Sequence, residues 1–260
     1  MAHKNILHML TPLENISPFD VNMALDAGYD AVVPYTSVGL GKVAGLVQDA
    51  IFSRPPSRGP RTGVFIGGRD AVLALDMLEA AKNAQTPPFG ASLFADPAGS
   101  FTTAAAMMAS VEKVLKTRHG RELKDLRLLV FGATGVVGFS AAVIAALEGA
   151  RATLVGYDGL ERVANAAAQI KARFGVDVQV ADGSSEDKKS ALVKGAQAIV
   201  CAGRAGVRVL TSAQIAAADE LLLAADANAV PPTGIEGLDA FAMGEPIGSS
   251  SALGDRKSVV

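Results

Sequence analysis

The chain has 260 residues, half of them hydrophobic, and a formal net charge of -2. This length suffices for one large domain or two ordinary ones, each with a filled core. The near-neutral charge provides no basic surface for nucleic acid, and the single cysteine, Cys201, excludes an internal disulfide framework and a multi-cysteine metal cluster. Because the sequence shows neither a membrane-spanning apolar stretch nor a signal peptide, we expect a soluble cytoplasmic protein.

Short apolar runs alternate with helical patterns through the first half of the chain. Strands are predicted at 6–10, 31–35, 63–66 and 92–95, and helices at 18–28, 43–52, 71–82 and 101–117, the first with Ser17 as N-cap and Pro18 at its first position. Residues 54–61, rich in Pro, Ser and Arg, are expected to form a loop. Such alternation is typical of a parallel sheet whose ligands bind at the carboxyl ends of its strands.

The most informative motif lies in the middle of the chain. Strands predicted at 126–131 and 152–155 flank a helix at 136–147, and glycines fill the first turn of this βαβ unit. A dinucleotide pyrophosphate binds at such a helix start, where a Cβ would prevent its close approach to the backbone. Ala133 stands where the first glycine of G-x-G-x-x-G belongs, so the alternative is a merely structural turn. We predict that NAD or NADP binds at Gly132, Ala133, Thr134, Gly135, Val136, Val137 and Gly138.

Further cofactor candidates follow the other strands of the second half. Asp158 lies about twenty residues past the glycines, where an acid usually accepts hydrogen bonds from the ribose hydroxyls and repels a 2′-phosphate. The positive charge of Arg162 could partly offset that repulsion. The alternative is that Asp158 begins the helix predicted at 159–174. Later strands are expected at 176–180, 198–202 and 221–225, with a polar helix from about 182 to 188, and Cys201 is expected to be a packed strand residue. The candidates after the glycine loop are Tyr157, Asp158, Arg162, Asp182, Ala202, Gly203, Arg204, Asp226 and Asn228.

The pattern as a whole predicts two α/β lobes with a cleft between them. They are an N-terminal α/β substrate domain at 1–120 and a Rossmann-type domain with a doubly wound parallel sheet at 121–260. Candidates for substrate binding are Asp20, Tyr35, Asp96, Ser100, Thr102 and Thr103. In the structural alternatives, Asp20 closes a capping box, Tyr35 is an edge residue, and Thr102 and Thr103 cap the long helix. No metal site is expected, because His3, His8 and His119 lack metal-site spacing.

Six strings carry a family resemblance that covers most of the chain. They are SPFDVNMALDAGYD from Ser17, RTGVFIGG from Arg61, FADPAGSFTTAAA from Phe94, GATGVVG from Gly132, AGRAG from Ala202 and ADANAVPPTGIEGLD from Ala225. With these strings the chain resembles the NAD(P)-dependent methylene-tetrahydromethanopterin dehydrogenases of methylotrophic bacteria. The resemblance implies oxidation of the methylene-bridged one-carbon unit on tetrahydromethanopterin to the methenyl form, with hydride passing to NAD or NADP. Some relatives also accept methylene-tetrahydrofolate.

The implied chemistry agrees with the residues available. Hydride leaves a carbon flanked by two nitrogens whose lone pairs stabilise the product cation, so alignment and negative potential suffice without a strong general base. We predict that Asp20 and Asp96 are the catalytic carboxylates. NADP-restricted relatives carry basic residues where this chain has Tyr157 and Asp158, which favours acceptance of NAD. The resemblance also implies a homo-oligomer and, in relatives, a strand and a helix beyond the position of Val260.

Other functions remain open from the sequence. A module that binds NAD(P) as a sensed ligand or an assembly aid, without turnover, would need only the glycine loop, and a methylene-tetrahydrofolate dehydrogenase would share the chemistry. A shikimate-dehydrogenase-like enzyme would need a lysine in a T-x-P-x-K context, and no such string occurs. A glutamyl-tRNA reductase would need a cysteine in the N-terminal lobe, whereas Cys201 lies in the second.

Overall fold

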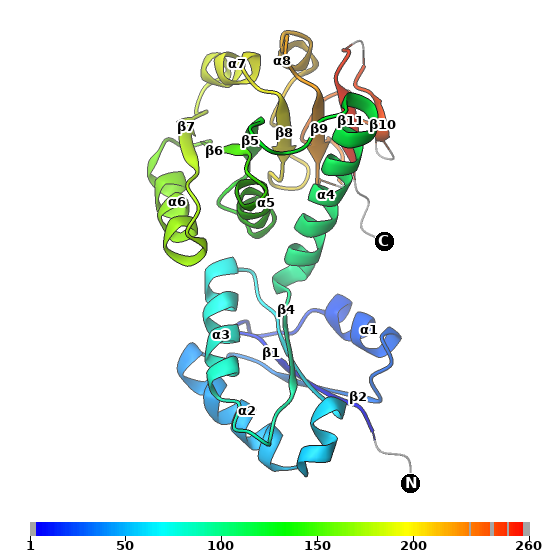
Figure 1. The fold of residues 1–260 in the computed structure, drawn as a ribbon, viewed down its shortest axis with the longest axis vertical. Coiled ribbons are helices and arrows are strands. Elements are labelled where there is room, and N and C mark those ends of the chain that lie inside the picture. Colours follow the sequence, from blue (N-terminus) through cyan, green and yellow to red (C-terminus); the bar gives the residue numbers. More distant parts are fainter. Residues whose placement is uncertain (1–3, 229, 240–241, 249, 257–260) are drawn as a thin grey trace. The chain divides into compact units, whose positions relative to one another are not determined.

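The computed structural model describes residues 4–228, 230–239, 242–248 and 250–256, and the chain divides into two compact units, 1–101 and 102–260 (Figure 1). Each unit is an α/β body built on its own sheet. Among the described residues, no helix is long and apolar enough to cross a membrane.

Unit 1 is built on a four-stranded sheet in the order β2-β1-β3-β4. All its pairings are parallel, so its strands end at one common edge. The strands are β1 (Ile6–Leu10), β2 (Ala31–Tyr35), β3 (Thr62–Ile66) and β4 (Ser92–Ala95), and the helices are α1 (Pro18–Asp26), α2 (Val43–Phe52) and α3 (Ala71–Asn83). Short 3-10 helices cover Leu40–Lys42, Pro56–Arg61 and Pro97–Gly99.

Helices cover both faces of the unit 1 sheet. On one face, Leu10 and Ile66 pack against α2 and α3 through residues such as Met77. On the other face, Met9 and Phe65 pack with α1. The alternation along β1 and β3 follows the two-residue period of a strand. A sheet buried on both sides explains why the strands of unit 1 are so apolar.

Unit 2 has a seven-stranded sheet in the order β10-β11-β9-β8-β5-β6-β7. The strands are β5 (Arg127–Phe131), β6 (Arg151–Gly156), β7 (Gln179–Asp182), β8 (Ala198–Cys201), β9 (Leu223–Asp226), β10 (Met243–Pro246) and β11 (Leu253–Arg256). The helices are α4 (Ser100–Val114), which begins just before the division and continues as a π-helical turn at Leu115–His119, α5 (Val136–Leu147), α6 (Glu161–Phe174), α7 (Glu186–Lys194) and α8 (Ser212–Ala216).

Helices α5 and α6 lie on one side of this sheet, and α7 and α8 on the other (Figure 1). All strand pairings are parallel except that of β10 with β11. From β7 through β5 to β9, the strand order is that of a doubly wound dinucleotide-binding sheet. The predicted Rossmann-type class is therefore confirmed, with one antiparallel strand at its edge.

Several local predictions were wrong. The strand expected at 176–180 is β7, at Gln179–Asp182, because its pairing with β6 begins at Gln179. The polar helix expected to end at Lys188 is α7, which begins after its N-cap Ser185 and continues to Lys194. Residues 56–61 form a 3-10 helix rather than a loop. The elements α8, β10 and β11 were not predicted.

Candidate functional site

A pocket of about 330 Å³ opens in unit 1 at the carboxyl ends of its strands. It is lined by Thr11 and Leu13 after β1, residues 15–20 around the start of α1, Gly68 and Arg69 after β3, and Ala98 after β4. Parallel α/β sheets bind their ligands at this edge, and the volume is within the usual range for a small-molecule site. The pocket is therefore a cavity of unit 1 large enough for a small-molecule substrate.

Asp20 brings a carboxylate into this pocket from the first turn of α1. The residue is only 9% exposed, and no hydrogen bond to its carboxylate is found in the described part of the chain. Burial, and secondarily the negative charge of Asp96, raise the pKa of Asp20 above its ordinary value. Ser17, the N-cap of α1, makes no side-chain capping bond, so the capping-box alternative for Asp20 is wrong.

Asp96 organises the turn that leads from β4 into α4. Its Oδ1 accepts a hydrogen bond from the Phe101 N–H at 2.7 Å, which satisfies an amide at the helix start. Within the turn Ala98 has a φ of 55°, a left-handed conformation that a residue with a Cβ adopts only when its surroundings hold it there. Ser100 is buried, and its Oγ lies 3.5 Å from the carbonyl oxygen of Ala98. Of this strained turn, Ala98 lines the pocket, whereas Asp96 and Ser100 are not among the lining residues.

The other substrate candidates lie elsewhere. The Tyr35 hydroxyl is 3.1 Å from Nδ1 of His8, and its ring packs with the core on the α2 and α3 face of the sheet. Burial, followed by the charge of Arg54, lowers the pKa of His8. Tyr35 therefore does not line the pocket that holds Asp20. Thr102 is exposed and Thr103 half-buried within α4, which begins at Ser100.

The glycine loop lies between β5 and α5 at the switch point of the unit 2 sheet, since β5 pairs with β6 on one side and β8 on the other. Gly132 has a φ of 73°, and a Cβ there would lie 2.2 Å from the Ala202 carbonyl oxygen in the loop after β8. A Cβ on Gly138 would lie 2.3 Å from the Gly132 carbonyl oxygen. Packing of the loop itself therefore excludes side chains at both positions.

Gly135 has a different reason to be glycine. Its φ of -82° suits any residue, and an added Cβ would meet only the Gly132 carbonyl oxygen, at 3.3 Å, among the described atoms. It is the N-cap of α5, whose first amides, including those of Val136 and Val137, have no intrahelical acceptors, and the N-cap residue supplies no side-chain acceptor in their place. A bare helix start is the cradle that a pyrophosphate needs. The buried methyl group of Ala133 belongs to the core.

Four predicted cofactor residues come together at the end of β6. Arg162 donates from Nη1 to the Tyr157 hydroxyl at 2.8 Å and to Asp158 Oδ2 at 3.3 Å, and from Nη2 to Thr134 Oγ1 at 3.4 Å. These contacts join the end of β6 to the glycine loop. The N-cap of α6 is Leu160, so the alternative in which Asp158 begins this helix is wrong. The ribose-binding role of Asp158 stays a prediction.

Four further candidates lie at the ends of the neighbouring strands β7 and β8. Asp182 ends β7, where its carboxylate pairs with Lys188 at 2.6 Å and accepts from the Ser184 N–H at 2.9 Å. These bonds, above all that from Lys188, lower the pKa of Asp182 to about 2, so it is ionised at neutral pH. The loop after β8 holds Ala202, Gly203 and the exposed Arg204. The Ala202 N–H donates to the Phe131 carbonyl oxygen at 2.9 Å, which holds this loop beside the glycine loop.

Asp226 and Asn228 bind their own loop. Asp226 is fully buried, with Oδ1 accepting from the Asn228 N–H at 2.9 Å and Oδ2 from the Ile235 N–H at 3.1 Å. Asn228, only 4% exposed, donates to the Pro232 carbonyl oxygen and accepts from the Val230 N–H. These bonds hold the loop after β9 in place, and contact of Asp226 and Asn228 with the cofactor stays a prediction.

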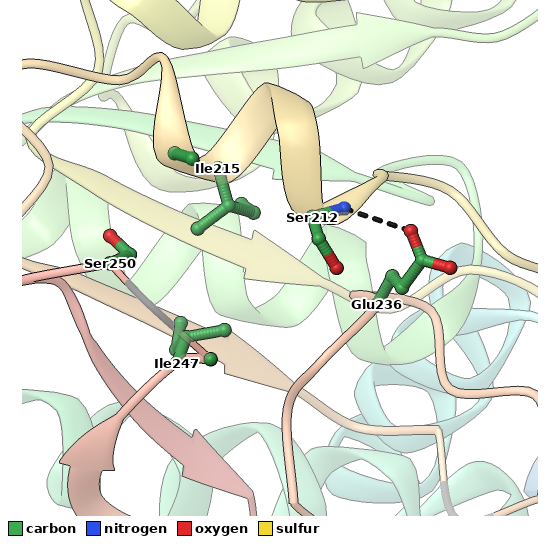
Figure 2. A pocket seen from close by; sticks show the side chains of 7 residues that line it. Ser212, Ile215, Glu236, Ile247 and Ser250 are labelled. Atoms are coloured by element: carbon green, nitrogen blue, oxygen red, sulfur yellow. Dashed lines mark hydrogen bonds between the residues drawn. The ribbon is translucent and has the colours of Figure 1, made fainter.

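Two other features of unit 2 are Cys201 and a small hollow beside α8. Cys201 is buried in β8, as predicted, and burial followed by the charge of Asp226 raises its pKa to about 12. A hollow beside α8 has a volume of only about 20 Å³, room for about one water molecule (Figure 2). Ser212 lies at its rim and donates its N–H to Glu236. In the described ranges, no three His, Cys, Asp or Glu side chains gather to hold a metal ion.

Comparison with known proteins decides the family. A family profile described as "Methylene-tetrahydromethanopterin dehydrogenase, N-terminal" matches residues 18–98. The NAD(P)-dependent methylenetetrahydromethanopterin dehydrogenase of Methylorubrum extorquens is 53% identical over 251 residues, which cover 96% of this chain and 84% of the relative. The chain belongs to the methylene-tetrahydromethanopterin dehydrogenase family. The resemblance predicted from the six sequence strings is thereby confirmed.

More distant proteins share parts of this family's sequence or its fold. "Bifunctional protein MdtA" of the same organism is 34% identical over 92% of this chain and 81% of its own length. A putative malic enzyme has a TM-score of 0.59 at 12% identity, over 90% of this chain and 62% of that one. The ligand-free 5-ketofructose reductase of Gluconobacter sp. strain CHM43 has a TM-score of 0.56 at 17% identity, over 97% and 86%. The two solved structures show the fold alone.

In this member of the family, much of the pocket wall consists of residues that the sequence did not mark as candidates. Leu13, Asn15, Phe19 and Arg69 line the cavity but were not among the candidates. Asn15 and Arg69 lie in segments that directly follow β1 and β3, so the rule that ligands bind at strand ends could have found them. Phe19 is 53% exposed and precedes Asp20 in the first turn of α1, so the predicted start of this helix also pointed to it.

Proposed function

We propose that this chain oxidises the methylene-bridged one-carbon unit of tetrahydromethanopterin to the methenyl form, with NAD or NADP as the hydride acceptor. Family membership supports the reaction, and the open cradle at Gly135 supports the cofactor, because packing within the protein does not require glycine there and a side chain would fill the space in front of the helix start. When bound, the nicotinamide supplies the carbon that accepts the hydride. A sensor without turnover is less well supported, since the relative at 53% identity is named as a dehydrogenase.

The residues of unit 2 fit the cofactor in three places. We assign the pyrophosphate to the main-chain amides of the glycine loop, at the bare start of α5. The adenosine end is assigned to Tyr157, Asp158 and Arg162, which the structure brings together beside Thr134. The loop after β8, with Ala202, Gly203 and Arg204, is assigned to the nicotinamide side because it packs against the glycine loop. Asp182 remains a proposed contact at the neighbouring strand end.

The substrate is assigned to the predicted domain at 1–120, and within it to the pocket that holds Asp20. The methenyl product carries a positive charge shared by two nitrogens, and a half-enclosed carboxylate stabilises such a charge more strongly than water does. Asp20 fits this role because it lines the pocket and because no hydrogen bond from the described residues neutralises its charge. Asp96 adds negative potential and holds the turn. Ser100, Thr102 and Thr103 remain proposed contacts, and Tyr35, bound to His8, is the least supported of them.

The test uses purified chain with methylene-tetrahydromethanopterin and either NAD or NADP, while formation of the methenyl product and of the reduced nicotinamide is followed by absorbance. We expect equal amounts of the two products. Asp20→Asn should lower kcat by an order of magnitude or more, since a charge that stabilises the transition state is removed. Asp26→Asn is the matched control, because Asp26 is an exposed acid at the end of the same helix. Cofactor binding without product formation would favour the sensor.

The finer points of this function are also proposals. We propose that tetrahydromethanopterin is preferred over tetrahydrofolate, that the enzyme works in the cytoplasm and that it assembles as a homo-oligomer. Parallel assays with both carriers test the first point, fractionation of cells the second, and light scattering of the purified chain the third. A higher kcat/KM with the folate carrier, activity confined to a membrane or secreted fraction, or a monomeric mass would each contradict the corresponding point.

A further inference from the structure

Arg162 occupies an unusual position for a cation. It lies in the first turn of α6, which begins at Glu161, whereas the other basic residues near an end of this helix, Lys171 and Arg173, lie in its last turn. The helix dipole disfavours a positive charge in the first turn. Its local partners offset this, because the guanidinium contacts Tyr157, Asp158 and Thr134 and lies 5.5 Å from the centre of the Tyr157 ring.

The ion pair between Arg162 and Asp158 is suited to exchange. The two groups are 3.3 Å apart, and their side chains are 52% and 40% exposed. An exposed pair of this kind is weak, whereas a guanidinium that grips a phosphate with two parallel hydrogen bonds is held strongly. A phosphate brought close to Asp158 would therefore draw Arg162 away from it. In this pair, Arg162 donates to Oδ2 of Asp158. No donor to Oδ1 of Asp158 is found in the described part of the chain.

We infer that Asp158 and Arg162 form an exchangeable pair that lets one adenosine site accept both NAD and NADP. This inference rests on the proposed function. With a free ribose 2′-hydroxyl, Asp158 accepts the hydroxyl hydrogen bond while Arg162 stays over the Tyr157 ring and neutralises the carboxylate. With a 2′-phosphate, the guanidinium leaves Asp158 and binds the phosphate, and its positive charge offsets the repulsion between phosphate and carboxylate. The dual use of cofactors thus comes from one side chain that changes its anionic partner.

The competing explanation is that Arg162 only fixes the end of β6 and the start of α6. Loss of a structural link would weaken every nucleotide at this site alike, because the glycine loop and Asp158 would both shift. Loss of an exchangeable partner would weaken only nucleotides with a 2′-phosphate. The two explanations therefore differ in a ratio of affinities, which does not depend on turnover.

The experiment measures binding of ADP-ribose and of its 2′-phosphate by calorimetry, with the full chain. These two probes differ only in the phosphate and lack the nicotinamide. Arg162→Gln should weaken the phosphorylated probe about tenfold and ADP-ribose less than about twofold. Asp158→Asn should strengthen the phosphorylated probe and weaken ADP-ribose. Lys171→Gln is the matched control, because Lys171 is a paired cation at the other end of the same helix, and it should change neither affinity.

Each other outcome overturns a different statement. If Arg162→Gln, shown to be folded by its melting temperature, weakens both probes equally, the exchange is wrong and the cofactor assignment stands. If the two affinities of Asp158→Asn move in the same direction, the opposing roles given to the pair are wrong. If the unchanged chain binds neither probe, the adenosine site proposed at the end of β6 is itself wrong, and the inference falls with it.

Discussion

Replacing Gly135 with alanine should separate cofactor binding from folding. The backbone at this position accepts alanine without strain, and the added methyl group would require the Gly132 carbonyl, at 3.3 Å, to move by only a few tenths of an ångström. Alanine is a poorer N-cap than glycine by up to about 1 kcal/mol, and the stiffer unfolded chain returns about 0.4–1 kcal/mol. The free energy of unfolding should therefore change by less than about 1 kcal/mol, which shifts the melting temperature by no more than about 4 °C.

Cofactor affinity should fall much further in the same variant. The methyl group would occupy the space against the first amides of α5, and each lost hydrogen bond to a phosphate is worth about 1.5–3 kcal/mol, or at least tenfold in affinity. NADH fluorescence reports binding, and scanning fluorimetry reports the melting temperature. Gly195→Ala is the control. Gly195 also has a negative φ and space for a Cβ, but it precedes β8 and so lies at the amino ends of the strands, away from the glycine loop. A Gly135→Ala protein that binds NADH like the wild type would refute the cradle.

Two substitutions and one labelling experiment test the remaining arguments. Gly138→Ala should lower the free energy of unfolding by about 1–3 kcal/mol, because its Cβ would lie 2.3 Å from the Gly132 carbonyl oxygen and the loop must shift; an unaltered urea transition would show that the loop adapts freely. The raised pKa of Asp20 means that the folded state holds the proton more tightly, so this residue's contribution to stability is largest below the ordinary aspartate pKa and is lost as pH rises through the folded pKa. Asp20→Asn should thus gain stability over the wild type at neutral pH but not in acid, and a difference in unfolding free energy that does not vary with pH contradicts this. Cys201, with a pKa of about 12 and no exposure, should react with a thiol reagent only after urea unfolding, and prompt reaction of the native chain would mean that β8 opens readily.

Elements with a clear period and clear ends were predictable from the sequence. The bounds of β1, β2, α2, β4 and α5 are those expected, because apolar runs or helical patterns there stop at Gly, Pro or polar residues. Strand β10 was not predictable, since Gly244 and Pro246 are poor strand residues and the strand exists through its pairing with β11. Helix α8 left a usable signal, the capping box of Thr211 and Gln214, which was overlooked.

The site was predictable in location more than in orientation. Strand ends and glycine spacing pointed to the loop after β5 and to the turn after β4, because the topology of a parallel sheet determines where ligands bind. The same rule said nothing about which way a polar side chain turns. Asp226 lies at a strand end yet is buried beneath its own loop, and Tyr35 turns toward His8. Arg162 touches Thr134 across 28 residues of sequence, a contact that no local pattern encodes.

The close approach of Gly132 to the Ala202 carbonyl has an evolutionary consequence. A side chain at position 132 would require the loop after β8 to rearrange first. A single substitution at this position is therefore not tolerated. The exposed residues 157, 158 and 162 carry no such constraint. Lineages of this enzyme should therefore diversify in their choice of nucleotide at the tip of β6 while the glycine turn beside it stays invariant.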